Sequence, residues 1–220
     1  NLEATRRYYK TDEELADDIV AAYRAFIADV YAVGCRNLQF DDCSWGMVVD
    51  PHAEQFFGTD AAGLERVKEA LLDVNNRALE GRPADLTVNT HVCRGNFHST
   101  WACEGGYDEV ADFLLARENV DAFFLEFDDA RSGGFEPLAK VPAGKKVVLG
   151  LVTTKSAALE DPAAVVARIH EAEKYVPLDH LRLSTQCGFS STEEGNVLTE
   201  DDQWAKIALV RRVAERVWGE

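Results

Sequence analysis

The chain alternates between two patterns of apolar residues. Long segments carry an apolar residue every three or four positions, as the buried face of a helix does, and short segments between them are almost continuously apolar. The helical spacing predicts helices over 11–33, 60–79, 108–117, from Pro162 onward and over 199–218. The apolar runs predict strands over 38–40, 86–91, 122–126, 146–152 and 181–184, and the segment through Trp45, Pro51 and Phe57 is expected to be a loop. Strands that alternate with helices or helix-bearing loops predict an α/β protein with a parallel sheet.

Capping residues support the helix boundaries. Thr11 precedes the first helix, and Glu14 three residues later completes the pattern of a capping box. Asp161 followed by Pro162 starts the fourth helix, and Thr199 precedes the last one. The first helix is expected to turn one apolar stripe towards the interior, made of Leu15, Ile19, Tyr23, Phe26, Ile27 and Val30.

Polar candidate residues follow the predicted strands directly. In (β/α)8 barrels the carboxyl ends of the strands carry the catalytic residues, so the expected fold is α/β of the TIM-barrel type. A doubly wound open sheet is the alternative, although no glycine-rich phosphate-binding turn follows any strand. Five strands do not close an eight-stranded barrel, and the chain enters a helix with no strand before it. We therefore expect residues 1–220 to form a single catalytic barrel domain with strands four to eight, lacking the first three strand–helix units.

Composition and charge narrow the range of partners. The apolar fraction of 46% and the charged fraction of 28% are those of a soluble globular protein. No apolar run approaches the roughly 20 residues needed to span a bilayer, and no signal-peptide pattern opens the chain. The formal net charge of −16 argues against nucleic acid or an anionic membrane as a partner. Five scattered cysteines without disulfide-framework spacing favour the reducing cytoplasm.

Four residues of metal-ligand type stand at strand ends. His91 and Cys93 close one apolar run, Glu126 ends the next, and Cys187 follows the last. His and Cys one residue apart in an extended segment point to the same face. Two thiolates, an imidazole and a carboxylate describe a four-coordinate zinc site. Any one of them alone is more often a core or loop residue, whereas four at successive strand ends favour the metal site. Cys103 is the competing ligand, in place of Glu126.

The segments around these ligands resemble one enzyme family. H-V-C-R-G-N, L-E-F and T-Q-C-G-F are similar to motifs in the C-terminal catalytic barrel of the cobalamin-independent methionine synthases, above all in their short bacterial methionine synthase II-like relatives. In that family an H-x-C pair, a Glu and a later Cys bind one zinc, which implies His91, Cys93, Glu126 and Cys187 here. The resemblance implies a zinc-dependent methyltransferase that activates homocysteine as a zinc-bound thiolate and methylates it to methionine.

The resemblance also implies roles beyond the metal. The family's Q-I-D-E strand end corresponds to Gln39-Phe40-Asp41-Asp42, which makes Asp41 the candidate contact for the homocysteine ammonium group. Glu126 is expected to be the ligand that the substrate sulfur displaces, so Glu126 and Asp41 are the candidate catalytic residues. Lys155 stands where the long folate-dependent enzymes carry a histidine. Poor use of methyltetrahydrofolate is therefore expected, and the methyl donor, methyltetrahydrofolate or another, stays open.

Further polar residues surround the H-x-C pair. Arg94, Asn96 and His98 follow it on a loop, and they are expected to support the ligands or bind the substrate carboxylate. The turn 131–134 resembles the family's polar turn after the zinc glutamate and could orient that carboxylate.

Two other functional hypotheses stay open. The same zinc chemistry could serve another thiol or a corrinoid methyl donor, and the chain could be an inert, zinc-stabilised fragment. The expected cofactor is Zn²⁺ in every case. The expected partners are homocysteine or a similar small thiol and a methyl donor, without nucleic acid or membrane, and a homo-oligomer is allowed.

Overall fold

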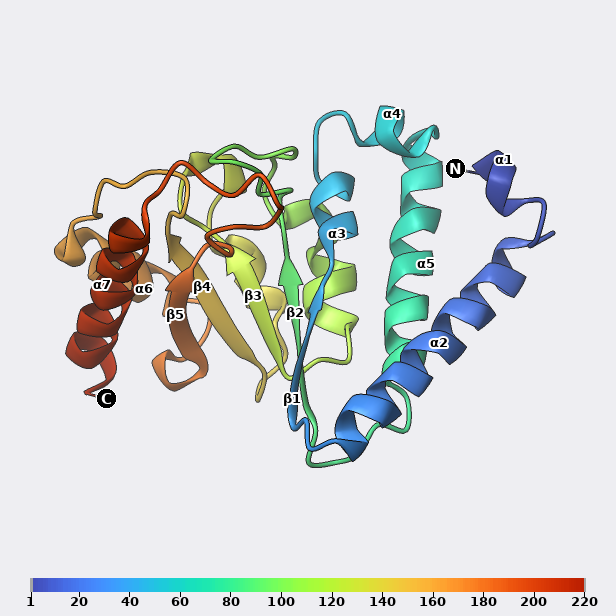
Figure 1. The fold of residues 1–220 in the computed structure, drawn as a ribbon, viewed down its shortest axis with the longest axis horizontal. Coiled ribbons are helices and arrows are strands. Elements are labelled where there is room, and N and C mark those ends of the chain that lie inside the picture. The colour runs from blue at the N-terminus through green and yellow to red at the C-terminus, as the bar shows by residue number, and fades with distance from the viewer. Residues whose placement is uncertain (1, 220) are drawn as a thin grey trace.

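Five parallel strands lie side by side in the order in which they occur along the chain (Figure 1). The structure is a computed structural model and describes residues 2–219. Its strands are β1 (Asn37–Asp41), β2 (Thr87–Val92), β3 (Ala122–Glu126), β4 (Lys146–Val152) and β5 (Leu181–Thr185). Sequential parallel neighbours form the wall of a (β/α) barrel, whereas a doubly wound sheet reverses its strand order at a switch point. The predicted α/β fold of the TIM-barrel type is confirmed for five strands, and the open-sheet alternative is excluded.

α-Helices join β1 to β2 and β4 to β5, and three of the long helices begin after the predicted caps. The long helices are α2 (Asp12–Ala32), α5 (Ala61–Leu79), α6 (Pro162–Ala172) and α7 (Glu200–Trp218), and the short ones are α1 (Leu2–Thr5), α3 (Cys43–Val48) and α4 (Ala53–Phe57). Thr11 and Thr199 each make both hydrogen bonds of a capping box, and Asp161 accepts from the backbone of Ala163. In Figure 1, α2 and α5 lie together on the β1 side of the sheet, and α6 and α7 lie on the β5 side. Among residues 2–219, no helix combines the length and the apolar composition needed to cross a membrane.

Two segments differ from the predicted elements. The predicted helix over 108–117 is a 3-10 turn, η1 (Asp108–Val110), followed by a π-helical turn, η2 (Ala111–Leu115). The wider π turn keeps Leu114 and Leu115 buried together. The predicted loop after β1 contains α3 and α4, because Asp42 at the strand end caps α3 by accepting from the backbone of Ser44. Three further 3-10 turns are η3 (Ala130–Ser132), η4 (Glu136–Lys140) and η5 (Leu178–His180).

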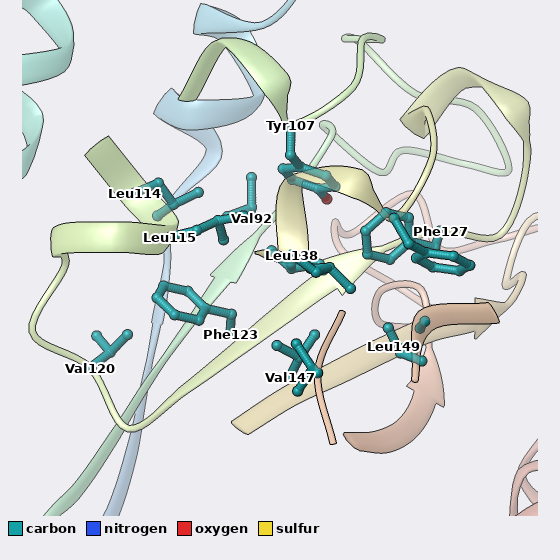
Figure 2. Close-up of a cluster of buried hydrophobic side chains, with 14 of the residues drawn as sticks. Val92, Tyr107, Leu114, Leu115, Val120, Phe123, Phe127, Leu138, Val147 and Leu149 are labelled. Carbon is teal, nitrogen blue, oxygen red and sulfur yellow. The ribbon is translucent and has the colours of Figure 1, made fainter. Parts of the chain in front are cut away.

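The core lies between the sheet and the elements that cover its outer face. Figure 2 shows Val92 of β2, Phe123 of β3 and Val147 of β4 gathered with Leu114 and Leu115 of η2. All five side chains are inaccessible to solvent. Full burial of one such side chain contributes roughly 1.5–3 kcal/mol. The three central strands are therefore the most strongly held part of the sheet.

Helix α2 is less buried than its apolar stripe predicts. Of the six stripe residues only Ile27 is buried, while Tyr23 and Phe26 stay about half exposed. The helix packs against α5, and Ile19, Tyr23 and Phe26 border a groove that Leu38 and Phe40 of β1 also line. The expectation that the whole stripe faces the interior is wrong for this part.

Candidate metal centre

The strand register brings the four predicted ligands to one edge of the sheet. In the β2–β3 ladder His91 lies opposite Phe124. Cys93 and Glu126 each follow two residues later, so Cys93 shares a face with His91 and lies beside Glu126. Strand β5 ends two residues before Cys187. All four side chains therefore lie at the carboxyl ends of parallel strands, the edge that the sequence predicts.

The four side chains form one cluster with metal-ligand spacing. One ligand atom from each of His91, Cys93, Glu126 and Cys187 lies within 4.8 Å of all the others. The sulfurs of Cys93 and Cys187 are 3.7 Å apart. Two sulfurs that each lie ~2.3 Å from one tetrahedral Zn²⁺ are ~3.8 Å apart, so this spacing suits a shared ion. Three of the residues are buried and Cys187 is half-buried.

His91 presents a lone pair to the cluster. Its Nδ1 lies 3.2 Å from the carbonyl oxygen of Phe124, which can only accept a hydrogen bond. This contact places the proton on Nδ1 and leaves Nε2 unprotonated, the arrangement of a metal-binding imidazole. Nε2 is buried and has no hydrogen-bond partner among the described residues. A buried polar atom without a partner is costly, and a metal ion would remove that cost.

The protein holds Glu126 at both carboxylate oxygens. Oε1 accepts the backbone N–H of Arg94 and Oε2 accepts Nη2 of Arg131, each at 2.9 Å. Burial raises the pKa of Glu126 above its ordinary value, against the lowering effects of the Arg94 N–H and the Arg131 charge. The Tyr107 hydroxyl accepts the backbone N–H of Glu126 at 3.0 Å and donates to its carbonyl at 3.3 Å. The strand end that carries this ligand is therefore fixed on its backbone and on its side chain.

Cys93 lies between two other thiols. Hydrogen bonds from Cys187 and from Cys43 lower the pKa of Cys93, and the same contacts raise the pKa of Cys187 and of Cys43. Burial lowers the pKa of His91, but the adjacent, negatively charged Cys93 outweighs burial and raises it. The cluster thus favours one thiolate at Cys93, and a bound divalent cation would remove the proton from Cys187 as well.

Two loops that carry the sulfur ligands are joined by side-chain amides. Asn96 donates from Nδ2 to the carbonyl of Gly188 at 3.0 Å and to the hydroxyl of Ser191 at 2.9 Å. Gln186 donates to Oδ1 of Asn96 at 3.3 Å. These bonds hold the turn that bears Cys187 against the loop that follows Cys93. The buried amide of Asn96 therefore stabilises the two loops that carry Cys93 and Cys187. Its predicted contact with substrate stays a prediction.

Asp41 and Cys43 border the cluster from β1. Their ligand atoms lie within 4.8 Å of each other and of the Cys93 sulfur, and both residues are exposed. Burial and the nearby Cys93 raise the pKa of Asp41. The sequence pattern gives no reason to choose Cys43. Asp41 lies opposite His91 at the end of the β1–β2 ladder, and helix α3 begins two residues later at Cys43, beside Cys93.

Three other predicted or competing residues lie outside the four-residue cluster. The guanidinium of Arg94 is fully buried, 4.6 Å from the centre of the Tyr107 ring, so only the backbone of Arg94 reaches Glu126. Cys103 is buried and belongs to neither ligand group found within residues 2–219, which favours Glu126 as the fourth ligand. His98 lies in a turn with a left-handed φ of 42°. The predicted contact of Arg94 with a substrate carboxylate stays a prediction.

Comparisons with known proteins agree with this fold and identify a family. Residues 4–209 match the family model described as Cobalamin-independent synthase, Catalytic domain. The chain is 45% identical over 216 residues to the uncharacterized protein YxjH of Bacillus subtilis (strain 168), covering 98% of this chain and 57% of that protein. It is 28% identical over 180 residues to the 5-methyltetrahydropteroyltriglutamate–homocysteine methyltransferase of Kali turgidum, covering 81% of this chain and 20% of that protein.

A solved structure shows the same fold. The chain superposes with a TM-score of 0.77 and 36% identity on a Listeria monocytogenes protein assigned to the vitamin-B12-independent methionine synthases. The match covers 97% of this chain and 58% of that protein. This chain therefore spans little more than half the length of YxjH and of the Listeria protein. On the family model and these similarities, the chain belongs to the family of the cobalamin-independent synthase catalytic domain.

Proposed function

We propose that this chain carries the zinc site of an S-methyltransferase that methylates homocysteine to methionine. The observation that carries the proposal is the convergence of His91, Cys93, Glu126 and Cys187 at the carboxyl edge of a barrel wall. The unpartnered Nε2 of His91 and the 3.7 Å between the two sulfurs fit a tetrahedral Zn²⁺. The similarity to plant homocysteine methyltransferases supports the same substrate class.

Different residues of this chain would bind the metal ion and recognise the substrate. Zn²⁺, when bound, would supply the positive charge that keeps a substrate thiol deprotonated at neutral pH. His91, Cys93 and Cys187 would hold the ion, and Glu126 would be the ligand that a substrate sulfur replaces. Asp41, exposed at the rim, accepts the substrate ammonium group in a charge-assisted hydrogen bond. This division assigns binding to the buried residues and recognition to the exposed one.

Methyltetrahydrofolate is expected to be used poorly as the methyl donor. Lys155, at the position of the family's histidine, has a nearly buried ammonium group that pairs with the buried carboxylate of Asp128. An ammonium group engaged in this way is a poor proton donor for a departing folate. Rapid methyl transfer from methyltetrahydrofolate as the sole donor would contradict this part of the proposal.

Metal content tests the proposed function directly. The full chain, loaded with zinc and freed of excess by gel filtration, is expected to retain one Zn²⁺ per chain. Cys93→Ser should lose it, because a hydroxyl is a poor zinc ligand at neutral pH. Cys43→Ser is the matched control and should retain the ion, because Cys43 lies outside the four-residue cluster. Full zinc occupancy in Cys93→Ser would contradict the assignment.

A further inference from the structure

Glu126 differs from Cys93 and Cys187 because a buried cationic side chain, that of Arg131, pairs with it. Its Oε2 accepts from Arg131 at 2.9 Å, and the two side chains are 1% and 5% exposed. The thiols of Cys93 and Cys187 instead contact each other, and Cys93 also contacts Cys43 and His91. A buried charge that keeps a partner is far less costly than one left unpaired. The carboxylate can therefore leave a metal ion at a lower cost than either thiolate.

Arg131 is itself fixed in place. Its Nη2 also donates to Asp128 at 2.9 Å, its Nη1 pairs with Asp129, and the guanidinium lies 4.8 Å from the centre of the Trp101 ring. Lys155 pairs with the second oxygen of Asp128. Two carboxylates, Glu126 and Asp128, are thus balanced by two cations, Arg131 and Lys155. This group of four buried side chains is electrically neutral without any metal ion.

We propose that Arg131 is a positioning residue that receives the Glu126 carboxylate when a substrate sulfur takes its place in the metal site. Asp128 and Lys155 keep the guanidinium aimed at Glu126, and Trp101 covers its outer face. Arg131 thereby determines that the glutamate, and not a cysteine, is the ligand that exchanges. This inference rests on the proposed function and names the residue that makes ligand exchange feasible.

Removal of the guanidinium charge should separate metal binding from thiol binding. In Arg131→Gln the departing carboxylate would become an unpaired buried charge, so it stays with the metal ion. We expect metal affinity to hold or rise while affinity for a thiol falls about tenfold, the lower limit for the loss of one hydrogen bond to a charged group. A purely structural role for Arg131 predicts the opposite for the metal, since a loosened site would bind it more weakly. Arg131→Lys keeps the charge and should recover part of the thiol affinity.

The test is a titration of the Co²⁺-loaded full chain with L-homocysteine, followed by the sulfur-to-cobalt absorption band. The matched control is Arg168→Gln. Arg168 also lies 4.8 Å from an aromatic ring, that of Phe135, and donates to the Phe127 carbonyl, but it does not contact Glu126. The control should bind cobalt and homocysteine as the unaltered chain does.

A double-mutant cycle identifies the route of the effect. If Arg131 acts through Glu126, Arg131→Gln should have no further effect on thiol affinity in a Glu126→Ala background. Equal thiol affinity in Arg131→Gln and the unaltered chain, or an undiminished effect in the Glu126→Ala background, would overturn the inference alone. An unaltered chain that binds cobalt but no thiol would overturn the proposed function, and this inference with it.

Discussion

The central strands and the outer strands of the sheet contribute differently to the candidate site. Strands β2, β3 and β4 are buried at almost every position, and their side chains fill the core in Figure 2. Strand β1 alternates between exposed and half-buried positions, and β5 is buried only at Leu181. Each outer strand has one neighbour within residues 2–219. The three central strands therefore each pair with a strand on both sides, whereas β1 and β5 each pair with a strand on one side.

The candidate site is divided along the same line. His91 and Glu126 lie at the ends of central strands, Cys93 follows β2 directly, and all three are buried. The fourth candidate ligand, Cys187, follows the outer strand β5 and is half-buried, and hydrogen bonds of Asn96 and Gln186 hold its turn against the loop after Cys93. Asp41, the proposed substrate contact, ends the outer strand β1 and is exposed. A metal site needs ligands held to within about 0.5 Å, and the rigid centre provides that. A substrate contact must instead stay accessible, and the outer strand leaves it so. The metal-binding half and the recognition half of the site thus have different structural support.

The largest expected effect contrasts the two regions directly. Phe123→Ala removes a fully buried ring from β3 and should lower the free energy of unfolding by about 3–5 kcal/mol. Phe40→Ala removes a half-buried ring from β1, which meets the Tyr23 ring edge-on at 5.5 Å, and should cost about 1 kcal/mol. Urea unfolding of both metal-free variants measures the difference. Similar losses in the two variants would show that β1 is as well supported as the centre.

The second expected effect concerns the ionisation of Glu118, a buried acid that Asn75 connects to Asp42 beside the outer strand β1. Asn75 donates to Oε1 of Glu118 at 3.1 Å and to Asp42, at the end of β1, at 2.8 Å. Burial, reinforced by the charge of Asp42, raises the pKa of Glu118 to about 8. Between the ordinary value of 4.5 and about 8, the folded chain keeps a proton that the unfolded chain releases. Stability must therefore fall as the pH rises through this window.

Glu118→Gln should remove that pH dependence, because an amide stays neutral and can still accept from Asn75. At about pH 7 the variant should be more stable by on the order of 3 kcal/mol, and near pH 4.5 the two proteins should be alike. Urea unfolding across this pH range measures it. Glu193→Gln, at an exposed glutamate, is the control and should change nothing. If the stabilities of Glu118→Gln and of the unaltered chain change with pH in the same way, Glu118 is ionised in the folded state.

Local signals made most of the fold and the ligand set predictable. Thr11 and Glu14 cap α2 through contacts within four residues, so the sequence contains all the information that the cap requires. The strands with buried faces appear as apolar runs. Once those strands are parallel and sequential, His91, Glu126 and Cys187 must lie at the same edge. Periodicity and strand order together were enough to bring these residues together.

Features that depend on distant neighbours could not be predicted in this way. The exposure of Tyr23 depends on what packs beside β1, and the approach of Cys43 to Cys93 depends on the β1–β2 register. The positive charge of Arg94 alone suggests an exposed side chain, but its guanidinium is buried against the Tyr107 ring. Nor does the sequence show that Arg131 contacts Glu126 and Asp128 at once, since this requires the path of the turn between them. These are tertiary contacts without a local pattern.

The smallest expected effect tests the recognition half of the site alone. Asp41→Asn keeps the size of the side chain and removes the charge that would pair with the homocysteine ammonium group. A charge-assisted hydrogen bond is worth about 1.5–3 kcal/mol, and the exposure of Asp41 places the effect at the lower limit, about a tenfold loss of affinity. Binding of 4-mercaptobutyrate, which has the thiol and the carboxylate but no amino group, should not change, and zinc content should stay at one ion per chain. Titrations of both thiols into the Co²⁺-loaded variant measure this difference.

If Asp41→Asn still prefers homocysteine as strongly as the unaltered chain does, the ammonium group is bound elsewhere, and β1 has no part in recognition. If zinc is lost as well, Asp41 supports the metal, and the division between a metal-binding centre and a recognition edge does not hold.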